Sequence, residues 1–456
     1  MKTITNSILY SFIILIFFSC NKESDTLNGL VIEEPPVEIK LPHVFINTNG
    51  AKIVDEPKVN AEMTIIVADQ IDYTGAIGIE IRGSSSQGFP KKQFGFETRD
   101  AANEDINVSL LGFPEEEDWI LYAPYSDKSL MRNMLMYDLS REIGRYASRS
   151  KFVYVTINDA YNGVYILLEK LKRDKNRIDI NKLKEDENSG EYLTGGYILK
   201  VDKAGGSNEM LYTDYNAITS LYPPKNATDG QKIHLVYDTP DEDDITTAQK
   251  TYISDYIASF ENALASTDFA DPDKGYNAYI DSQSFIEFFL LNELSNNVDG
   301  YRLSTWLTKD KNEKLKMGPI WDFNLAFGNA DYCGGGETNV WAYKFNERCS
   351  RDFWQVPFWW SRLLEDPAFV LQLKERWLAL RSNEFSNLAI SQKINSYIET
   401  LTSSGAIEEN YEKWPVLGEY VWPNNFVGNT YSEEKEYLVN WINNRLSWLD
   451  KEIYGL

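Results

Sequence analysis

The chain has 456 residues, of which 43% are hydrophobic, and a formal net charge of −24. This length is enough for a large core in two lobes or domains, and the charge disfavours nucleic acid or an anionic membrane surface as a partner. The two histidines, His43 and His234, are far apart in the sequence. A histidine-rich zinc site is therefore not expected, and a Ser-His-Asp triad has few candidates.

The N-terminus has the pattern of an export signal. A short charged start precedes an apolar run over residues 8–18, which is shorter than a typical transmembrane span. The sequence that ends at Cys20 is similar to a bacterial lipoprotein signal, in which the cysteine is acylated; the alternative is a cleaved signal peptide with an incidental cysteine. We expect residues 1–19 to be a signal peptide and residues 20–41 a tether. The lipid would hold the protein on the outer membrane or cell surface without a membrane span.

A loop of small residues lies between two predicted strands, residues 78–82 and 94–97. The backbone N–H groups of this loop, Gly83 to Ser86, could approach an anion, and Lys91 or Lys92 just beyond it could reach its phosphates. Serine- and glycine-rich hairpins are common without any ligand, so an ordinary turn is the alternative.

An arginine lies on the polar side of the next predicted helix. This helix begins after Ser126 or Asp127, either of which could cap it, and ends near Gly144. Arg132 lies off the apolar stripe of the helix. It could pair with an acidic residue or a phosphate, or simply face solvent.

A β-hairpin with strands over residues 152–157 and 164–168 ends at Glu169, and residues 195–202 form another strand. The surrounding sequence is locally basic, because residues 128–177 contain eleven Lys or Arg and five Asp or Glu. Such a stretch suits a polyanionic ligand such as a nucleotide. It could equally be a basic face that packs on the acidic remainder of the chain.

Two aspartates bracket a predicted hairpin further along the chain. An apolar helix over residues 285–294, capped by Ser284, is followed by a turn and then by a hairpin over residues 303–321. Asp299 precedes the hairpin and Asp322 leaves it, so the two carboxylates should come close together. They repel each other unless a cation lies nearby, which predicts a divalent metal and a base; two turn aspartates are the alternative.

Beyond residue 331 the chain is predicted to be mainly helical and is rich in aromatic residues. Cys333 and Cys349 could form a disulfide, which would contribute roughly 3 kcal/mol by closing a loop of this size, or could remain free thiols. Six tryptophans are most simply explained by packing, with sugar-stacking platforms as the alternative: Trp341, Trp354, Trp359, Trp360, Trp414 and Trp422.

Several short motifs occur along the chain: Arg82-Gly83-Ser84-Ser85-Ser86 with Phe89-Pro90-Lys91-Lys92, Tyr125-Ser126-Asp127-Lys128-Ser129-Leu130-Met131-Arg132-Asn133, Asn162-Gly163-Val164-Tyr165 with Glu169-Lys170, Gly195-Gly196-Tyr197, and Met317-Gly318-Pro319-Ile320-Trp321-Asp322-Phe323. Together and in this order, over roughly residues 41–455, they resemble the motifs of the spore-coat CotH kinase family. The resemblance implies an α+β fold of the atypical protein-kinase type over residues 42–456. A β-rich N-lobe would cover about residues 42–205 and a mainly helical C-lobe about residues 206–456.

The resemblance also implies roles for individual residues. Asp299 matches the catalytic aspartate, Asp322 the metal-binding aspartate, and Gly83 to Ser86 the loop that covers the phosphates of ATP. Lys91 or Lys92 would contact phosphate. Glu169 would either contact the nucleotide or form a structural pair.

Two positions depart from the pattern of a kinase metal site. Five residues after Asp299, where protein kinases have a metal-binding Asn, the chain has Ser304. Asn324 stands where many relatives are expected to have an acidic residue. Both are weaker candidate ligands of Mg²⁺ or Mn²⁺, which indicates one metal rather than two, or reduced activity.

We therefore expect a membrane-anchored kinase that uses ATP and a divalent cation to phosphorylate a Ser or Thr hydroxyl of a protein acceptor. The sequence does not identify that acceptor. The alternatives are a non-catalytic, kinase-like lipoprotein for binding or adhesion, which Ser304 and Asn324 favour, and a glycan-binding lipoprotein.

Overall fold

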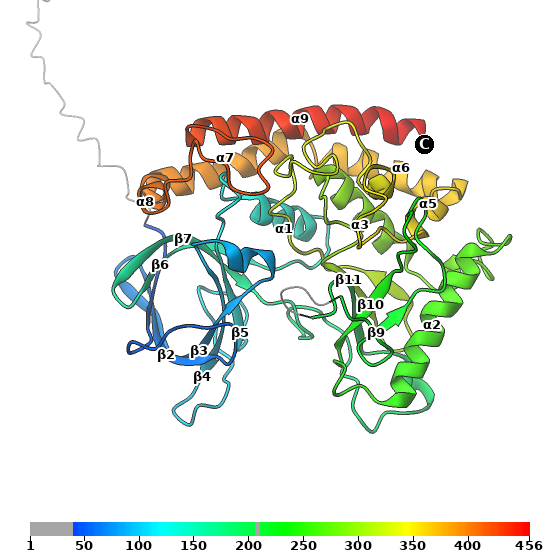
Figure 1. Cartoon of the computed structure of the whole chain (residues 1–456), viewed down its shortest axis with the longest axis horizontal. Coiled ribbons are helices and arrows are strands. Elements are labelled where there is room, and N and C mark those ends of the chain that lie inside the picture. Colours follow the sequence, from blue (N-terminus) through cyan, green and yellow to red (C-terminus); the bar gives the residue numbers. More distant parts are fainter. Residues whose placement is uncertain (1–39, 206–209) are drawn as a thin grey trace, which may run out of the picture. The chain divides into compact units, whose positions relative to one another are not determined.

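Seven strands in the first part of the chain close into a barrel (Figure 1). The computed structural model describes residues 40–205 and 210–456; the expected signal peptide, Cys20 and most of the expected tether lie outside the described residues. In spatial order the barrel strands are β1 (His43–Asn47), β2 (Val59–Val67), β3 (Gln70–Arg82), β4 (Gln93–Arg99), β5 (Asp118–Tyr122), β7 (Ala160–Glu169) and β6 (Ser150–Ile157). Neighbouring strands are antiparallel except β1 and β6, whose parallel pairing closes the barrel.

The barrel core is built by side chains that alternate along its strands. In β2, Ala61, Met63 and Ile65 are buried while the residues between them face outward. This period of two is expected of a strand that lays one face on a core. The buried residues pack with Phe96 of β4 and Leu121 of β5.

A second sheet, unlike the barrel, is antiparallel throughout. Its strand order is β12 (Leu315–Met317), β11 (Thr305–Lys309), β8 (Tyr197–Val201), β10 (His234–Thr239) and β9 (Ala217–Thr219). The predicted N-lobe, residues 42–205, includes β8, whereas β8 pairs here with β10 and β11. Residues 39–456 form one compact unit, so the predicted division into two lobes stays a prediction.

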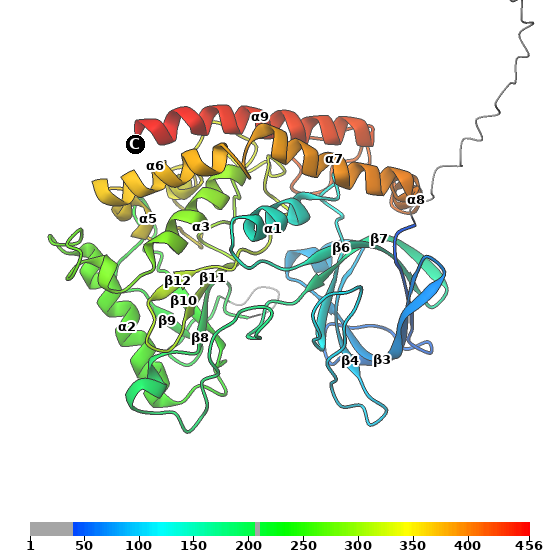
Figure 2. The same ribbon diagram turned by 180° about the vertical axis from the view of Figure 1, so that it is seen from behind.

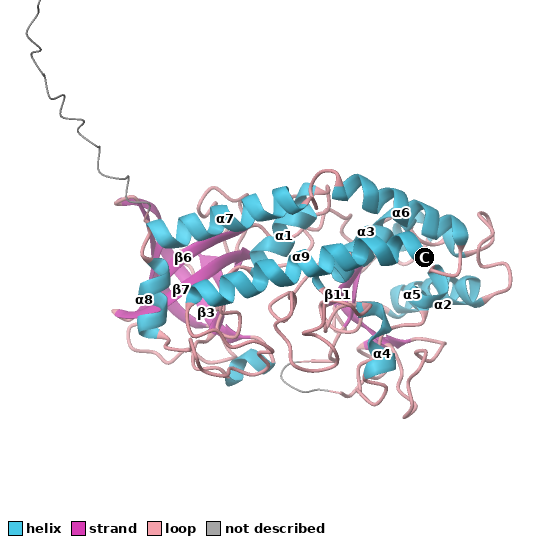
Figure 3. Ribbon diagram, turned by 90° about the horizontal axis from the view of Figure 1, so that it is seen from above, coloured by secondary structure: helices cyan, strands magenta, loops and turns pink. Residues whose placement is uncertain are grey.

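The long helices of the C-terminal part lie in one layer over both sheets, with α1 and α3 beneath them (Figure 2). Seen from above, α9 runs beside α6 and α7 (Figure 3). The helices are α1 (Arg132–Glu142), α2 (Thr247–Ala265), α3 (Ser282–Ser295), α4 (Phe345–Arg348), α5 (Trp359–Leu363), α6 (Pro367–Arg381), α7 (Asn387–Ser403), α8 (Ala406–Lys413) and α9 (Tyr431–Gly455). Four short 3₁₀ segments are η1 (Ser85–Gly88), η2 (Gly190–Thr194), η3 (Tyr276–Ala278) and η4 (Ala342–Lys344). None of the helices within the described residues is both long and apolar enough to span a bilayer.

Helix α3 leads into the turn that carries Asp299, and it is fixed at both ends. Its cap is Asp281, whose side chain accepts a hydrogen bond from the Ser284 N–H at 3.0 Å, so the predicted cap at Ser284 is wrong. Near the other end, Glu293 Oε2 lies 3.1 Å from Arg445 Nη2 of α9, and both side chains are fully buried. Burial raises the pKa of Glu293 and lowers that of Arg445 to about 10. Losing either partner would leave an uncompensated buried charge, so the pair anchors α3 to α9.

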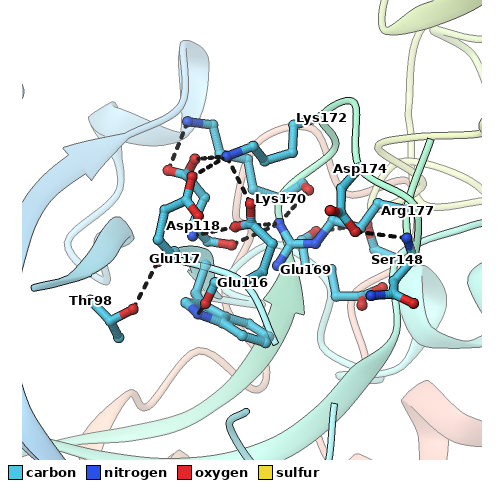
Figure 4. Close-up of polar contacts among 12 residues, drawn as sticks. Thr98, Glu116, Glu117, Asp118, Ser148, Glu169, Lys170, Lys172, Asp174 and Arg177 are labelled. Carbon is cyan, nitrogen blue, oxygen red and sulfur yellow. Dashed lines mark hydrogen bonds and ion pairs between the residues drawn. The ribbon is translucent and has the colours of Figure 1, made fainter. Parts of the chain in front are cut away.

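The basic residues of the stretch 128–177 contact carboxylates. Lys172 Nζ lies 2.6–2.8 Å from carboxylate oxygens of Glu116, Glu117 and Asp118 (Figure 4). Similar ion pairs join Lys128 to Glu434, Arg132 to Asp127, Arg145 to Glu287, Arg149 to Glu169 and Arg177 to Glu116. Packing on the acidic remainder of the chain therefore explains this stretch better than a polyanion site does.

The prediction of a mixed α+β chain, rich in strands first and in helices later, is confirmed. The closed barrel was not predicted. The likeness of the whole arrangement to a protein kinase stays a prediction.

Candidate active site

Asp299 and Asp322 are brought together at the open end of the β11–β12 hairpin. The pKa of Asp322 is raised to about 6, first by burial and then by the charges of Asp299 and Asp202. Arg82 and Lys203 partly offset this shift. Two further aspartates and two cationic side chains therefore lie close enough to Asp322 to act on its charge.

The backbone of Asp322 is held in an unusual conformation by neighbours on two elements. Its φ of +63° lies in the left-handed region, which Asp tolerates better than most residues. The Asp322 N–H donates to Tyr137 Oη of α1 at 3.3 Å, and its C=O accepts from Asn297 Nδ2 at 3.2 Å. Asn133 of α1 accepts from the next N–H, that of Phe323, at 2.6 Å. Helix α1 and the turn after α3 together fix the direction of this carboxylate.

Asp299 is held through a single carboxylate oxygen. Oδ1 accepts from Arg302 Nη2 at 2.6 Å and from Tyr332 Oη at 3.3 Å. Within residues 40–205 and 210–456, Oδ2 has no hydrogen-bond partner. The free oxygen is available to accept a further hydrogen bond.

Arg82 and Lys203 form the cationic side of the site. Lys203 Nζ donates to Ser84 Oγ at 3.0 Å. Gly83 has a φ of +105°, and a Cβ there would lie 2.1 Å from Ser86 Oγ, so the turn after Arg82 requires glycine. The turn sets the Ser84 hydroxyl beside an ammonium group, a combination suited to an anion such as phosphate.

A family model described as CotH kinase protein matches residues 79–449. The chain belongs to the CotH kinase protein family. No curated protein gives a significant match to it. The range matched to the CotH family contains the aspartates, the turn at Gly83 and the disulfide between Cys333 and Cys349, whose Cα atoms are 5.7 Å apart.

Three residues of this CotH site were not predicted as site residues. Asp202 ends the predicted strand 195–202 and Lys203 follows it, while Arg82 directly precedes the small-residue loop. Charged residues where a strand meets a loop are the signal that points to them. That signal is weak, because nothing local shows that β3 and β8 end at the same place.

Lys91 is not part of the cluster. Its side chain is 1% exposed, and Nζ donates to Val164 O of β7 at 2.6 Å and to Asn410 Oδ1 of α8 at 2.9 Å. Burial lowers the pKa of Lys91 well below its usual value. Of the two lysines predicted as alternatives for the phosphate contact, Lys91 therefore does not fit, since its Nζ ties the barrel to α8. Lys92 Nζ donates to Gln87 O at 2.5 Å, which braces the loop.

Replacing Lys203 by Met is expected to weaken the binding of an ATP analogue with Mg²⁺ by roughly tenfold or more, because a hydrogen bond to a charged group contributes about 1.5–3 kcal/mol. Lys91→Met, a buried change remote from the aspartates, is expected to leave this affinity unchanged. Titration calorimetry on both variants makes the comparison. A loss of affinity confined to Lys91→Met would instead assign the phosphate contact to Lys91 and not to Lys203.

Arg132 and Glu169 each form an ion pair with another residue of the chain. Arg132 is buried, with Nη1 2.5 Å from Asp127 Oδ1 and Nε donating to Ala326 O at 3.1 Å, so it does not face solvent. Glu169 is buried beside Arg149, whose Nη1 lies 2.7 Å from Oε1. Of the roles considered, the contacts support pairing with an acidic residue for Arg132 and structural pairing for Glu169.

Ser304 lies five residues after Asp299, and Asn324 lies two residues after Asp322. The Ser304 N–H donates to the carboxylate of Asp202, and the Asn324 C=O accepts from Asn329 Nδ2 at 2.8 Å. In the described part of the chain, neither side chain forms a hydrogen bond. Both oxygens therefore stay available as weak ligands.

The oxygen donors around Asp322 suit a hard divalent cation. The pKa of this carboxyl group is raised, and a nearby positive charge would favour its ionised form. Among the described residues, the acidic triplet with all ligand atoms within 4.8 Å of one another is Glu116, Glu117 and Asp118. These carboxylates already form ion pairs with Lys170, Lys172 and Arg177 (Figure 4). A metal at Asp322 would accordingly be held by one or two carboxylates, with phosphate oxygens and water as further ligands, as is usual for Mg²⁺.

Proposed function

We propose that this CotH-family protein transfers the γ-phosphoryl group of ATP to a Ser or Thr hydroxyl of a protein acceptor, in a reaction that requires Mg²⁺ or Mn²⁺. We further propose that it acts as a lipoprotein, anchored through Cys20 to the outer membrane or cell surface. The observation that carries the proposal is the convergence of Asp299, with one free oxygen, and Asp322, with its raised pKa, beside Arg82 and Lys203.

Each side chain has a defined task in this proposal. Asp322 would hold the cation, which neutralises charge on the phosphates when bound. Lys203, Arg82 and the Ser84 hydroxyl would hold the phosphates. Asp299 Oδ2 would take the proton of the acceptor hydroxyl as the new O–P bond forms and the bond to the departing ADP oxygen breaks.

The test is incubation of the purified protein with γ-labelled ATP, a divalent cation and envelope proteins. We expect label to appear on protein only when the cation is present. Binding of ATP without any transfer would support the non-catalytic alternative, in which Ser304 and Asn324 reflect a degenerate site.

Glycan binding through the tryptophan-rich C-terminal part is less well supported. Trp341, Trp359 and Trp360 are 9%, 1% and 1% exposed and form part of the core. Trp422 is 51% exposed, but its ring is parallel to that of Tyr332, so it belongs to the surroundings of Asp299. Packing therefore accounts for the buried tryptophans.

A further inference from the structure

The side chain of Tyr332 contacts the proposed catalytic carboxylate from a part of the chain remote from the hairpin. Tyr332 Oη and Arg302 Nη2 donate to the same oxygen of Asp299, Oδ1, at 3.3 and 2.6 Å. Two donors on one oxygen restrict rotation of the carboxylate about its Cβ–Cγ bond. They also leave Oδ2 as the oxygen that can accept a proton.

The first of these donors is itself rigidly held. Arg302 is 3% exposed, and its Nε donates to Val298 O at 2.9 Å. Its Nη1 lies 3.2 Å from Asp352 Oδ1, and the guanidinium lies 4.1 Å from the centre of the Phe345 ring. Arg302 therefore needs no help from Tyr332 to keep its place.

Tyr332 depends on its loop for its position. The next residue, Cys333, is bonded to Cys349, and the Cys333 C=O accepts from Arg348 Nε at 2.8 Å. The Tyr332 ring is parallel to the Trp422 ring, with an interplanar angle of 3° and centres 6.3 Å apart. The disulfide thus involves the residue directly after the one whose phenol reaches Asp299.

The chemistry of the phenol suits a holding role. Burial first, and then the charge of Asp299, raise the pKa of Tyr332, so the phenol stays protonated and donates at neutral pH. A general base is effective only when its free oxygen meets the acceptor proton in a narrow range of geometry, so a donor that fixes the other oxygen supports catalysis without touching the substrate.

We propose that Tyr332 is a positioning residue for Asp299 and that the Cys333–Cys349 disulfide acts through it, by holding the loop that brings the phenol to Oδ1. This inference rests on the proposed function. Tyr332 contacts neither the acceptor nor the cation, and its effect is confined to the orientation of the base.

The experiment compares phosphoryl transfer by the wild type, Tyr332→Phe, Cys333→Ser/Cys349→Ser and the triple variant, in the full-length protein. We expect Tyr332→Phe to lower kcat about tenfold, in line with the loss of one hydrogen bond to a charged group, with the KM for ATP unchanged. The cysteine variant should lower kcat to a similar extent. The triple variant should be no slower than Tyr332→Phe, because both changes remove the same contact.

Tyr222→Phe is the matched control. Its phenol donates to Asn262 Oδ1 of α2 at 2.8 Å, and neither residue belongs to the loop that holds Tyr332, so kcat should not change. If the cysteine variant fails to fold, reduction of folded wild type and of Tyr332→Phe with dithiothreitol replaces it. Reduction should then slow the wild type and leave Tyr332→Phe unaffected.

Each of three results would overturn the positioning role. The first is a triple variant whose loss of kcat is the product of the losses in Tyr332→Phe and in the cysteine variant. The others are an unchanged kcat in Tyr332→Phe and an effect confined to KM. These results leave the proposed function intact, because the wild type is still active. A wild type that transfers no phosphoryl to any acceptor would instead refute the proposed function and the positioning role together.

Discussion

Asp299→Asn is expected to lower kcat for phosphoryl transfer by roughly 10²–10⁴, the range in which a positioned general acid or base contributes. The amide keeps the shape of the side chain and can still accept from Arg302, but it cannot take up the acceptor proton. Affinity for ATP should change little, because in the proposed mode the phosphates are held by Lys203 and the Ser84 hydroxyl. Transfer rates and ATP calorimetry on the same preparation test both statements.

The control for this change is Asp310→Asn, at the other end of the same hairpin. Asp310 accepts from Asn181 Nδ2 at 3.1 Å and does not approach Asp299. Its replacement should leave kcat unaltered. If Asp299→Asn transfers phosphoryl as fast as wild type, then Asp299 is not the base and the catalytic assignment fails.

Asp322→Asn is expected to abolish the cation dependence of ATP binding and, at the same time, to stabilise the metal-free protein at neutral pH. Asn tolerates the positive φ of this position as Asp does, so the substitution should not strain the backbone. The folded pKa of about 6 exceeds the value of about 3.9 for an unfolded Asp. The folded state therefore holds the proton more tightly, and the ionised carboxylate destabilises it by about 1–3 kcal/mol above pH 6.

The stability difference between wild type and Asp322→Asn should depend on pH. As the pH falls from 7.5 to 5, Asp322 takes up a proton in the folded state before it does so in the unfolded state, so the difference in stability between wild type and Asp322→Asn should shrink. Urea unfolding in a chelator at the two pH values measures it. Binding of Mn²⁺ should weaken about tenfold per pH unit below pH 6, because the cation must displace this proton. Equal stability of the two proteins at pH 7.5 would contradict the buried, repelled carboxylate.

The elements around the aspartates could be predicted because their signals are local. A polar turn between two short apolar runs specifies the β11–β12 hairpin, and a hairpin necessarily brings Asp299 near Asp322. The apolar run 285–294 likewise predicts α3, although the cap lies three residues earlier, at Asp281.

The contact between Lys203 and Ser84, proposed to hold the phosphates, could not be predicted, because it depends on pairings between distant parts of the chain. Lys203 reaches Ser84 only because β8 joins β11 in the second sheet, and Lys91 turns away because α8, more than 300 residues later, supplies Asn410. The closed barrel was missed for the same reason. Its closure depends on a parallel pairing of His43–Ile46 with Tyr154–Ile157, which no short-range pattern reveals.

The most direct test of the whole account is the anomalous scattering of Mn²⁺ in crystals grown with a non-hydrolysable ATP analogue. We expect the manganese peak at the carboxylate of Asp322, with the phosphates beside Lys203 and Ser84 and the terminal phosphate within reach of Asp299. A manganese ion bound at Glu116, Glu117 and Asp118, or phosphates bound away from Asp322, would contradict the central claim.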